Sequence, residues 1–352
     1  MTHDVTAPGP LGPKTQLSRT PAELGRALKE YTRPDLARSL VEIAASAIPF
    51  AVLWIAMWLA FVHVGYWLVL LLALPAAGFL VRLFMIQHDC GHGSVFKTRR
   101  ANDWLGRALG VLTLTPYDHW RHTHGMHHAG AGHLDRRGIG DVATLTVREY
   151  RARSRWGRFA YRVYRHPLLL FGAGPVFVFV FQHRLPVGFL RGGAVHWTST
   201  MSTNAGIAGV AAAMMWAVGV VPFLMIHAPI VVLASAAGVW LFYVQHQFEH
   251  TSWDGADAWR HPEAALHGSS HYALPAPLRW ITADIGIHHV HHLSSRIPHY
   301  RLSQVLRDFP ELRDVNRMTL RESLGCVRLT LWDEDTRRLV PFSAAGPLAT
   351  AR

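Results

Sequence analysis

The sequence predicts an all-α integral membrane protein with four transmembrane helices in two hairpins, joined to a helical cytoplasmic cap. Half of the 352 residues are hydrophobic and only 16% are charged, whereas about a quarter of the residues in soluble proteins are charged. Residues 43–81 and 192–248 contain no Asp, Glu, Lys or Arg. Histidines gather in four clusters, two of which come at the ends of these uncharged stretches.

Each uncharged stretch can hold two membrane helices, because one span needs about 20 apolar residues. We expect spans at about residues 43–62, 67–88, 205–221 and 230–247. The membrane domain covers residues 41–310, with an N-terminal arm at residues 1–40 and a C-terminal tail at residues 311–352. Residues 168–181 are apolar but too short to span, so we expect them to lie in the membrane interface or to dip into it.

The basic residues predict which side of the membrane each segment faces. The net charge is +12, yet the turns expected near residues 63–66 and 222–229 carry no Lys or Arg. By the positive-inside rule, both termini and the cap of residues 89–200 and 249–310 lie in the cytoplasm. A basic surface that faces membrane lipids explains the charge, so we expect no nucleic-acid partner.

The histidine clusters have the spacing of metal ligands. Residues three and four apart share one face of a helix, so each cluster presents its imidazoles in one direction. The ten histidines at these spacings are His88, His92, His124, His127, His128, His246, His250, His288, His291 and His292. Ten imidazoles are too many for one four-coordinate zinc ion and suit two metal ions better. Imidazole binds zinc, copper, nickel and iron, so ligand type alone leaves the metal open.

The two expected hairpins bring these clusters together. The second and fourth spans both run toward the cytoplasm, so His88 and His246 finish on the same face. Three carboxylates lie next to a ligand or one turn away from it, namely Asp89, Glu249 and Asp284. Metal-bound imidazoles usually donate their second N–H to such a group, although these carboxylates could equally face the membrane interface.

Five motifs resemble those of the membrane fatty acid desaturase family, in its bacterial acyl-lipid and acyl-chain form. They read HDCGHGSVF from residue 88, WRHTHGMHH from residue 120, LDRRGIGD from residue 134, FYVQHQFEHTSW from residue 242 and IGIHHVHHLSSRIP from residue 285. The resemblance covers about residues 80–310. The chain departs from the family pattern at Asp284 and His299, where related sequences tend to carry asparagine.

This resemblance implies a di-iron enzyme of the bacterial inner membrane. All ten histidines match family ligands, and His246 and His250 match the pair that completes the site, whereas His119, His122 and His289 match no ligand. The family uses O₂, two electrons and two protons to remove two hydrogens from adjacent methylenes of a lipid-linked or carrier-linked acyl chain. No catalytic residue beyond the iron ligands is implied, because hydrogen atoms rather than protons are removed.

An external electron donor is also implied, because the sequence has no haem motif, CxxC pair or nucleotide fingerprint. A ferredoxin or a similar one-electron carrier fits this requirement. The Arg-rich segment 148–165 could attract an acidic donor, or it could equally contact anionic lipid.

Other functions remain open from the sequence. A di-iron enzyme on the same scaffold could hydroxylate or ketolate a lipid such as a carotenoid, or oxidise a terminal fatty acid carbon. A zinc-dependent membrane hydrolase, receptor or transporter belongs to a different class. Transport is disfavoured because the spans lack charged residues apart from Arg82, near a helix end.

Overall fold

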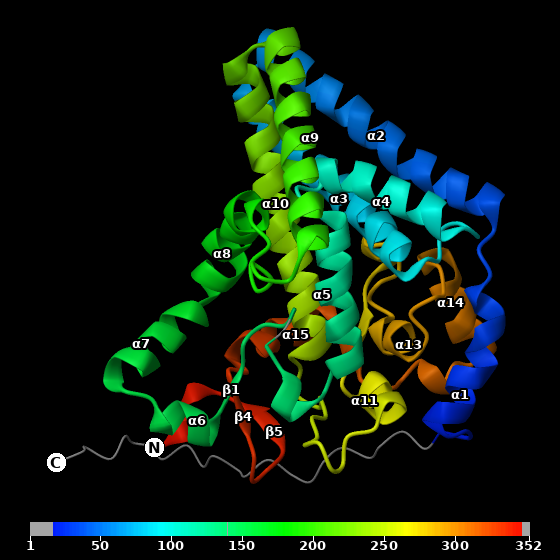
Figure 1. Cartoon of the computed structure of the whole chain (residues 1–352), viewed down its shortest axis with the longest axis vertical. Coiled ribbons are helices and arrows are strands. Elements are labelled where there is room, and N and C mark those ends of the chain that lie inside the picture. The colour runs from blue at the N-terminus through cyan, green and yellow to red at the C-terminus, as the bar shows by residue number, and fades with distance from the viewer. Residues whose placement is uncertain (1–16, 139, 347–352) are drawn as a thin grey trace.

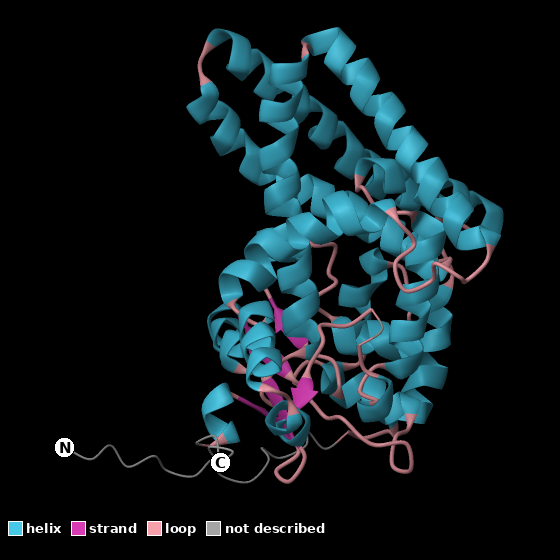
Figure 2. Cartoon of the chain, turned by 60° about the vertical axis from the view of Figure 1, so that its left-hand side comes forward, coloured by secondary structure: helices cyan, strands magenta, loops and turns pink. Residues whose placement is uncertain are grey.

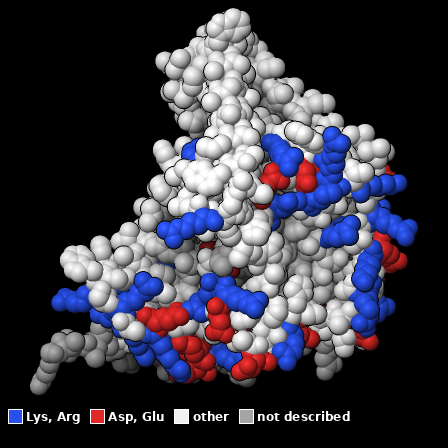
Figure 3. All heavy atoms as spheres, viewed as in Figure 1, with Lys and Arg blue, Asp and Glu red and all other residues white. Residues whose placement is uncertain are grey.

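The computed structural model describes residues 17–138 and 140–346 of a mostly helical protein (Figure 1). Two hairpins project from one side of it, and their helices are α2 (Leu36–His63), α3 (Tyr66–His92), α9 (Ala194–Val218) and α10 (Val220–His246). All four are long and apolar enough to cross a membrane. On the face seen in Figure 3, the upper part of the molecule is free of charged residues, which gather lower down. The predicted pair of membrane hairpins is confirmed.

The cap is built mainly from short helices, with a few strands among them (Figure 2). Its α-helices are α1 (Pro21–Ala27), α4 (Arg99–Leu112), α5 (Tyr117–Gly130), α6 (Val147–Ala152), α7 (Arg155–Tyr164), α8 (Gly174–Val176), α11 (His261–His267), α12 (Ala276–Ile281), α13 (His288–Leu293), α14 (His299–Asp308) and α15 (Leu320–Ser323). Its strands are β1 (Leu145–Thr146), β2 (His271–Ala273), β3 (Arg317–Thr319), β4 (Leu331–Asp333) and β5 (Arg338–Val340).

The strands form two small sheets that the sequence did not lead us to expect. In one sheet β4 lies between β1, which runs parallel to it, and the antiparallel β5. In the other sheet β2 and β3 pair in parallel. Three of the five strands come from residues 317–340, so most of the expected C-terminal tail is an integral part of the cap.

The described part of the N-terminal arm also belongs to the cap. Leu24 and Leu28 are fully buried, and they share a hydrophobic cluster with Val290 of α13 and with Leu302 and Val305 of α14. This cluster ties the arm to the helix that carries the last group of histidines. Residues 1–16 of the predicted arm lie outside the described residues.

The second hairpin turns earlier than predicted. We expected the turn at residues 222–229, but α9 ends at Val218 and α10 begins at Val220. Gly219 makes the turn with a φ of 94°, which costs little only for glycine. Pro222 is tolerated in the first turn of α10, where its missing N–H would have no helical partner. The turn of the first hairpin, at Val64 and Gly65, lies where it was expected.

The apolar segment after α7 is bent away from that helix. Two π-helical turns flank the short α8, at Leu169–Ala173 and Phe177–Phe181. Residues Leu169–Arg184 meet the length and apolarity required of a span only together with α7, from which they are bent by 55°. Such a bent pair can be a broken span or a re-entrant loop, so the position of this segment in the membrane interface stays a prediction.

A close helix contact fixes α4 and α5 beside the end of α3. Gly106 of α4 lies against the ring of Tyr117 of α5, and a Cβ on Gly106 would be only 2.2 Å from Cε2 of that ring. The Tyr117 side chain is fully buried, and its hydroxyl donates to the carbonyl of Cys90 at 2.9 Å. Tyr117 thereby connects α5 to the end of α3, where two of the predicted ligands lie.

We therefore expect Gly106→Ala to destabilise the protein by about 1–3 kcal/mol, as overpacking does in other cores. The measurement is the thermal unfolding midpoint of the detergent-solubilised protein. Gly209→Ala is the matched control, because Gly209 is also helical but has open space around its Cβ position. An unchanged midpoint in Gly106→Ala would show that the Tyr117 ring can move aside without cost.

Candidate metal centre

Nine of the ten predicted histidines meet in two groups below the hairpins. The first group is His88, His92, His124, His128 and His291, and the second is His127, His246, His288 and His292. Within each group one nitrogen of every ring lies within 4.8 Å of one such nitrogen of every other ring. We refer to them as the five-histidine group and the four-histidine group.

Four helices supply these side chains. The end of α3 carries His88 and His92, and the end of α10 carries His246. Within the cap, α5 and α13 each carry a set of three at positions i, i+3 and i+4, and each set is divided between the two groups. Adjacent histidines point about 100° apart around a helix, so His127 and His128 fall in different groups.

The nitrogen atoms within each group are spaced as ligands of one ion. In the five-histidine group, Nε2 of His128 is 3.1 Å from Nε2 of both His124 and His291. In the four-histidine group, Nε2 of His246 is 3.1 Å from that of His127 and 3.0 Å from that of His288. Two nitrogens about 2.1 Å from one ion, at a right angle, would be about 3.0 Å apart.

Hydrogen bonding alone would satisfy these nitrogens poorly. Each imidazole nitrogen is either a hydrogen-bond donor or an acceptor. One Nε2 therefore cannot donate a hydrogen bond to one neighbour and accept a hydrogen bond from another. A shared cation satisfies all of them at once. Five converging donors also exceed the four that zinc takes in its usual tetrahedral sites, whereas imidazole also suits iron. The two donor sets therefore fit two metal ions, and the five-histidine group offers more donors than a tetrahedral zinc ion takes.

The surroundings keep the cap histidines in the neutral form that binds metals. Burial, followed by the charge of neighbouring imidazoles, holds the pKa values of His124 and His128 well below 6.5. The same causes lower the pKa values of His288, His291 and His292. These rings are already deprotonated at neutral pH, so binding a cation displaces no proton from them.

His250 lies outside both groups, although its spacing from His246 had suggested a shared helical face. Helix α10 ends at His246, and the backbone of Gln247 leaves the helical conformation with φ −110° and ψ 75°. The four-residue periodicity therefore stops before His250, whose side chain is exposed. No asparagine, proline or glycine marks this helix end, so it could hardly be predicted from the sequence.

One of the three predicted carboxylates contacts a ligand. Asp89 accepts a hydrogen bond from Nδ1 of His88 at 3.3 Å. Glu249 is exposed, and Asp284 instead pairs with Arg279 at 3.0 Å. In the described structure neither forms a hydrogen bond or ion pair with a histidine of the two groups.

Asp141, which the sequence had not singled out as a partner of a histidine, contacts Nδ1 of His127. Each group thus has one imidazole whose Nδ1 contacts a carboxylate oxygen. The pair lies 14 residues apart in sequence, because a loop that includes Gly140 at φ 70° brings Asp141 back to α5. No helical or strand periodicity predicts such a contact.

A cavity of about 610 Å³ runs from the metal centre into the membrane part. His88, His124 and His288 line one end of it. Apolar residues line it between α3 and α10, and the segment after α7 closes another side. The apolar lining includes Leu80, Val81, Phe84, Val231, Ala234, Val178 and Phe179. A long apolar chain in this cavity would pass directly beside both histidine groups.

Comparison with known proteins places these features in one family. The family described as Fatty acid desaturase matches residues 65–322. A fatty acid desaturase of Bacillus subtilis is 42% identical over 324 residues, which cover 92% of this chain and 91% of that protein. A Synechocystis protein named sn-1 acyl-lipid omega-3 desaturase (ferredoxin) is 30% identical over 62% of this chain and 61% of its own. The chain therefore belongs to the fatty acid desaturase family, whose members are membrane oxidoreductases.

Proposed function

We propose that this protein introduces a double bond into a fatty acyl chain at a di-iron centre, with O₂ as co-substrate. The observation that carries the proposal is the apolar cavity that ends on two groups of converging histidines. The five-histidine group would hold one iron and the four-histidine group the other. When bound, these irons would supply the oxidising power that removes two hydrogens from neighbouring methylenes, using O₂ and external electrons.

The role of the chain is to place one pair of methylenes beside the histidines and to keep water away. Holding a substrate in a reactive position can account for a large part of an enzyme's rate enhancement. Bulky apolar side chains along α3 and α10 can hold an extended acyl chain by burial alone. The methylenes nearest His88 and His288 are then the ones that become oxidised.

The lining also suggests which end of the acyl chain enters first. Between α3 and α10 the cavity is apolar apart from Ser235 and, next to the ligand His246 in sequence, Gln245, so no charged side chain there can receive a charged headgroup. Gln182, His183 and His119 line the side nearer the cap. We infer that the methyl end lies between the membrane helices and that the ester or carrier end leaves past these polar residues.

The membrane orientation follows from charge. We propose that the cap and both termini face the cytoplasm of a bacterial cell, because the short turns at the far end of both hairpins carry no Lys or Arg. The metal centre would then lie at the inner surface of the cytoplasmic membrane. An acyl chain could rise from the lipid into the cavity without crossing water.

The electrons would come from a ferredoxin-like carrier. Two relatives, from Synechocystis and Nostoc, carry the name sn-1 acyl-lipid omega-3 desaturase (ferredoxin). The cap also exposes several arginines on α6 and α7, among them Arg148 and Arg155, which could attract an acidic protein. By the same comparison we propose a lipid-linked acyl chain as the substrate.

Expression in a host that lacks this activity tests the proposal. We expect mass spectrometry of the host fatty acids to show a new species that is lighter by two hydrogen atoms than a saturated host fatty acid. Derivatisation of the double bond then locates it along the chain. Finding only oxygenated products would contradict the desaturase and would favour the hydroxylase or ketolase alternative.

A further inference from the structure

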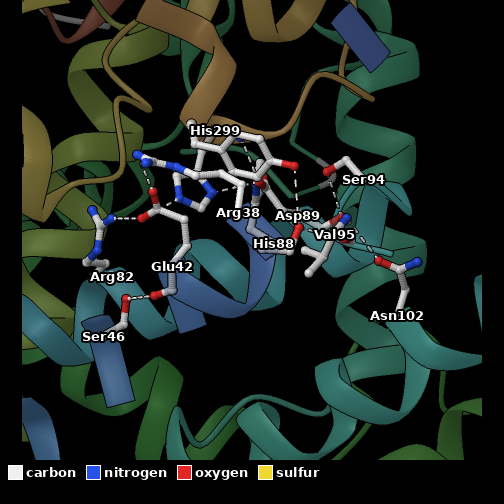
Figure 4. Close-up of polar contacts among 12 residues, drawn as sticks. Arg38, Glu42, Ser46, Arg82, His88, Asp89, Ser94, Val95, Asn102 and His299 are labelled. Carbon is white, nitrogen blue, oxygen red and sulfur yellow. Dashed lines mark hydrogen bonds and ion pairs between the residues drawn. The ribbon is translucent and has the colours of Figure 1, made fainter. Parts of the chain in front are cut away.

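A buried polar network reaches the five-histidine group from the membrane side (Figure 4). It contains Glu42 of α2, Arg82 and Asp89 of α3, and His299 at the start of α14. Each of these side chains is almost fully buried. Burying this many ionisable groups costs free energy unless each group is paired with another. The way these four side chains pair therefore matters for the stability of the network.

His299 lies between the two carboxylates of this network. Its Nδ1 donates to Oδ2 of Asp89 at 2.8 Å, and its backbone N–H donates to the same oxygen at 2.8 Å. Its Nε2 lies 3.6 Å from Oε2 of Glu42. The other oxygen of Asp89 accepts from Nδ1 of His88. Figure 4 shows His299 above Glu42 and Asp89, with His88 beneath.

The two carboxylates differ in the cations that balance them. Glu42 contacts the guanidinium groups of Arg82 and Arg38. Asp89 instead pairs with His88 and His299, and neither partner is an arginine or lysine. If His88 binds a metal as a neutral ring, His299 is the one described side chain in contact with Asp89 that can carry a balancing positive charge.

The electrostatics of His299 agree with a charged ring. Burial by itself would lower the pKa of His299, but the contacts with Asp89 and Glu42 outweigh burial and raise it to about 9. The imidazolium form is therefore favoured at neutral pH. The pKa values of the predicted metal-binding rings of the cap are shifted in the opposite direction. His299 therefore differs from them in its favoured protonation state as well as in position.

The four-histidine group has no matching cation. Asp141 contacts His127 much as Asp89 contacts His88, but its side chain is 22% exposed. In the described part of the chain, no Lys or Arg forms an ion pair with Asp141. Partial exposure to water can stabilise that carboxylate, whereas Asp89 is closed off from water and depends on protein groups.

We propose that His299 is a positioning residue for the five-histidine group. Through its Nδ1 and its backbone N–H it holds the Asp89 carboxylate directed at Nδ1 of His88, which leaves Nε2 of His88 facing the metal. This inference rests on the proposed di-iron function. It also makes the two metal positions unequal, because among the described residues a second buried imidazole holds Asp89 but none holds Asp141.

The test measures how fast a ferrous chelator removes iron from the purified, iron-loaded full-length protein. Wild type should contain about two irons per chain and release them in two phases. We expect His299→Leu and His299→Asn to accelerate one phase about 10- to 100-fold, the usual cost of losing a group that supports a metal-binding histidine. Asp141→Asn is the matched variant, and it should accelerate the other phase.

A double substitution separates positioning from general destabilisation. If His299 acts through Asp89, adding His299→Asn to Asp89→Asn should not accelerate release further, because coupled residues are not additive. Wild-type release in both His299 variants, equal acceleration of both phases, or additive effects in the double variant would each overturn the inference. A wild-type protein without two irons would instead refute the di-iron function itself.

Discussion

His128→Ala is expected to abolish desaturation, since this side chain belongs to the five-histidine group and also packs against the four-histidine group. Its Nε2 lies within 3.1 Å of the nitrogens of two other members of the five-histidine group. Its ring also stacks on His292 of the four-histidine group, with ring centroids 4.1 Å apart and planes at 16°. Removing it deletes one ligand and removes the packing that orients another.

The expected loss of activity is larger than about 100-fold. Substituting a residue that only hydrogen-bonds to a metal ligand already lowers metal affinity or activity by about 10- to 100-fold. Desaturated fatty acids in cells expressing each variant at matched levels provide the measurement, and iron content of the purified variant provides a second readout. His63→Ala is the control, since His63 is exposed at the far end of α2. Equal product from wild type and His128→Ala would contradict the assignment of the metal centre.

The sequence allowed most of this centre to be predicted, for a physical reason. Ligands carried by one helix keep a fixed spacing of three and four residues, so the sets on α5 and α13 were visible as patterns. Hydropathy located the spans that end near His88 and His246, and their parallel direction implied that these ends would meet. Nine of the ten predicted histidines are accordingly brought together.

The features that were missed depend on contacts between distant segments. Asp141 reaches His127 through a loop, and His299 reaches Asp89 from 210 residues away. His250 was included because the helix was assumed to continue, whereas α10 ends four residues earlier. Such contacts are set by tertiary packing, and no local periodicity reports them.

The geometry also bears on the zinc alternative. A structural or hydrolytic zinc site uses three or four protein ligands. The five-histidine group offers one donor more than that, and a second group with four donors lies beside it. Metal analysis that found one zinc and no iron would contradict the proposed di-iron centre.

Gly238→Leu is expected to change which acyl chains are accepted, because Gly238 lines the cavity deep between the membrane helices. No atom lies within 4 Å of the position that its Cβ would occupy, so the new side chain would extend into open space. Gly238 precedes His246 by eight residues, about 12 Å along a helix that rises 1.5 Å per residue. A leucine there would shorten the space for the methyl end without touching the ligands.

The longest chains should suffer most, since they must either leave the cavity or displace the leucine. Forcing extra carbon atoms into packed space costs about 1–3 kcal/mol, which corresponds to roughly 5- to 150-fold in rate. Competition between saturated chains of different length should therefore shift toward the shorter ones by a factor in this range. Gly209→Leu is the matched control, because Gly209 lies on α9 with open space around it and does not line the cavity. An unchanged chain-length preference in Gly238→Leu would mean that the acyl chain does not extend between α3 and α10, and that its methyl end leaves the metal centre by another route.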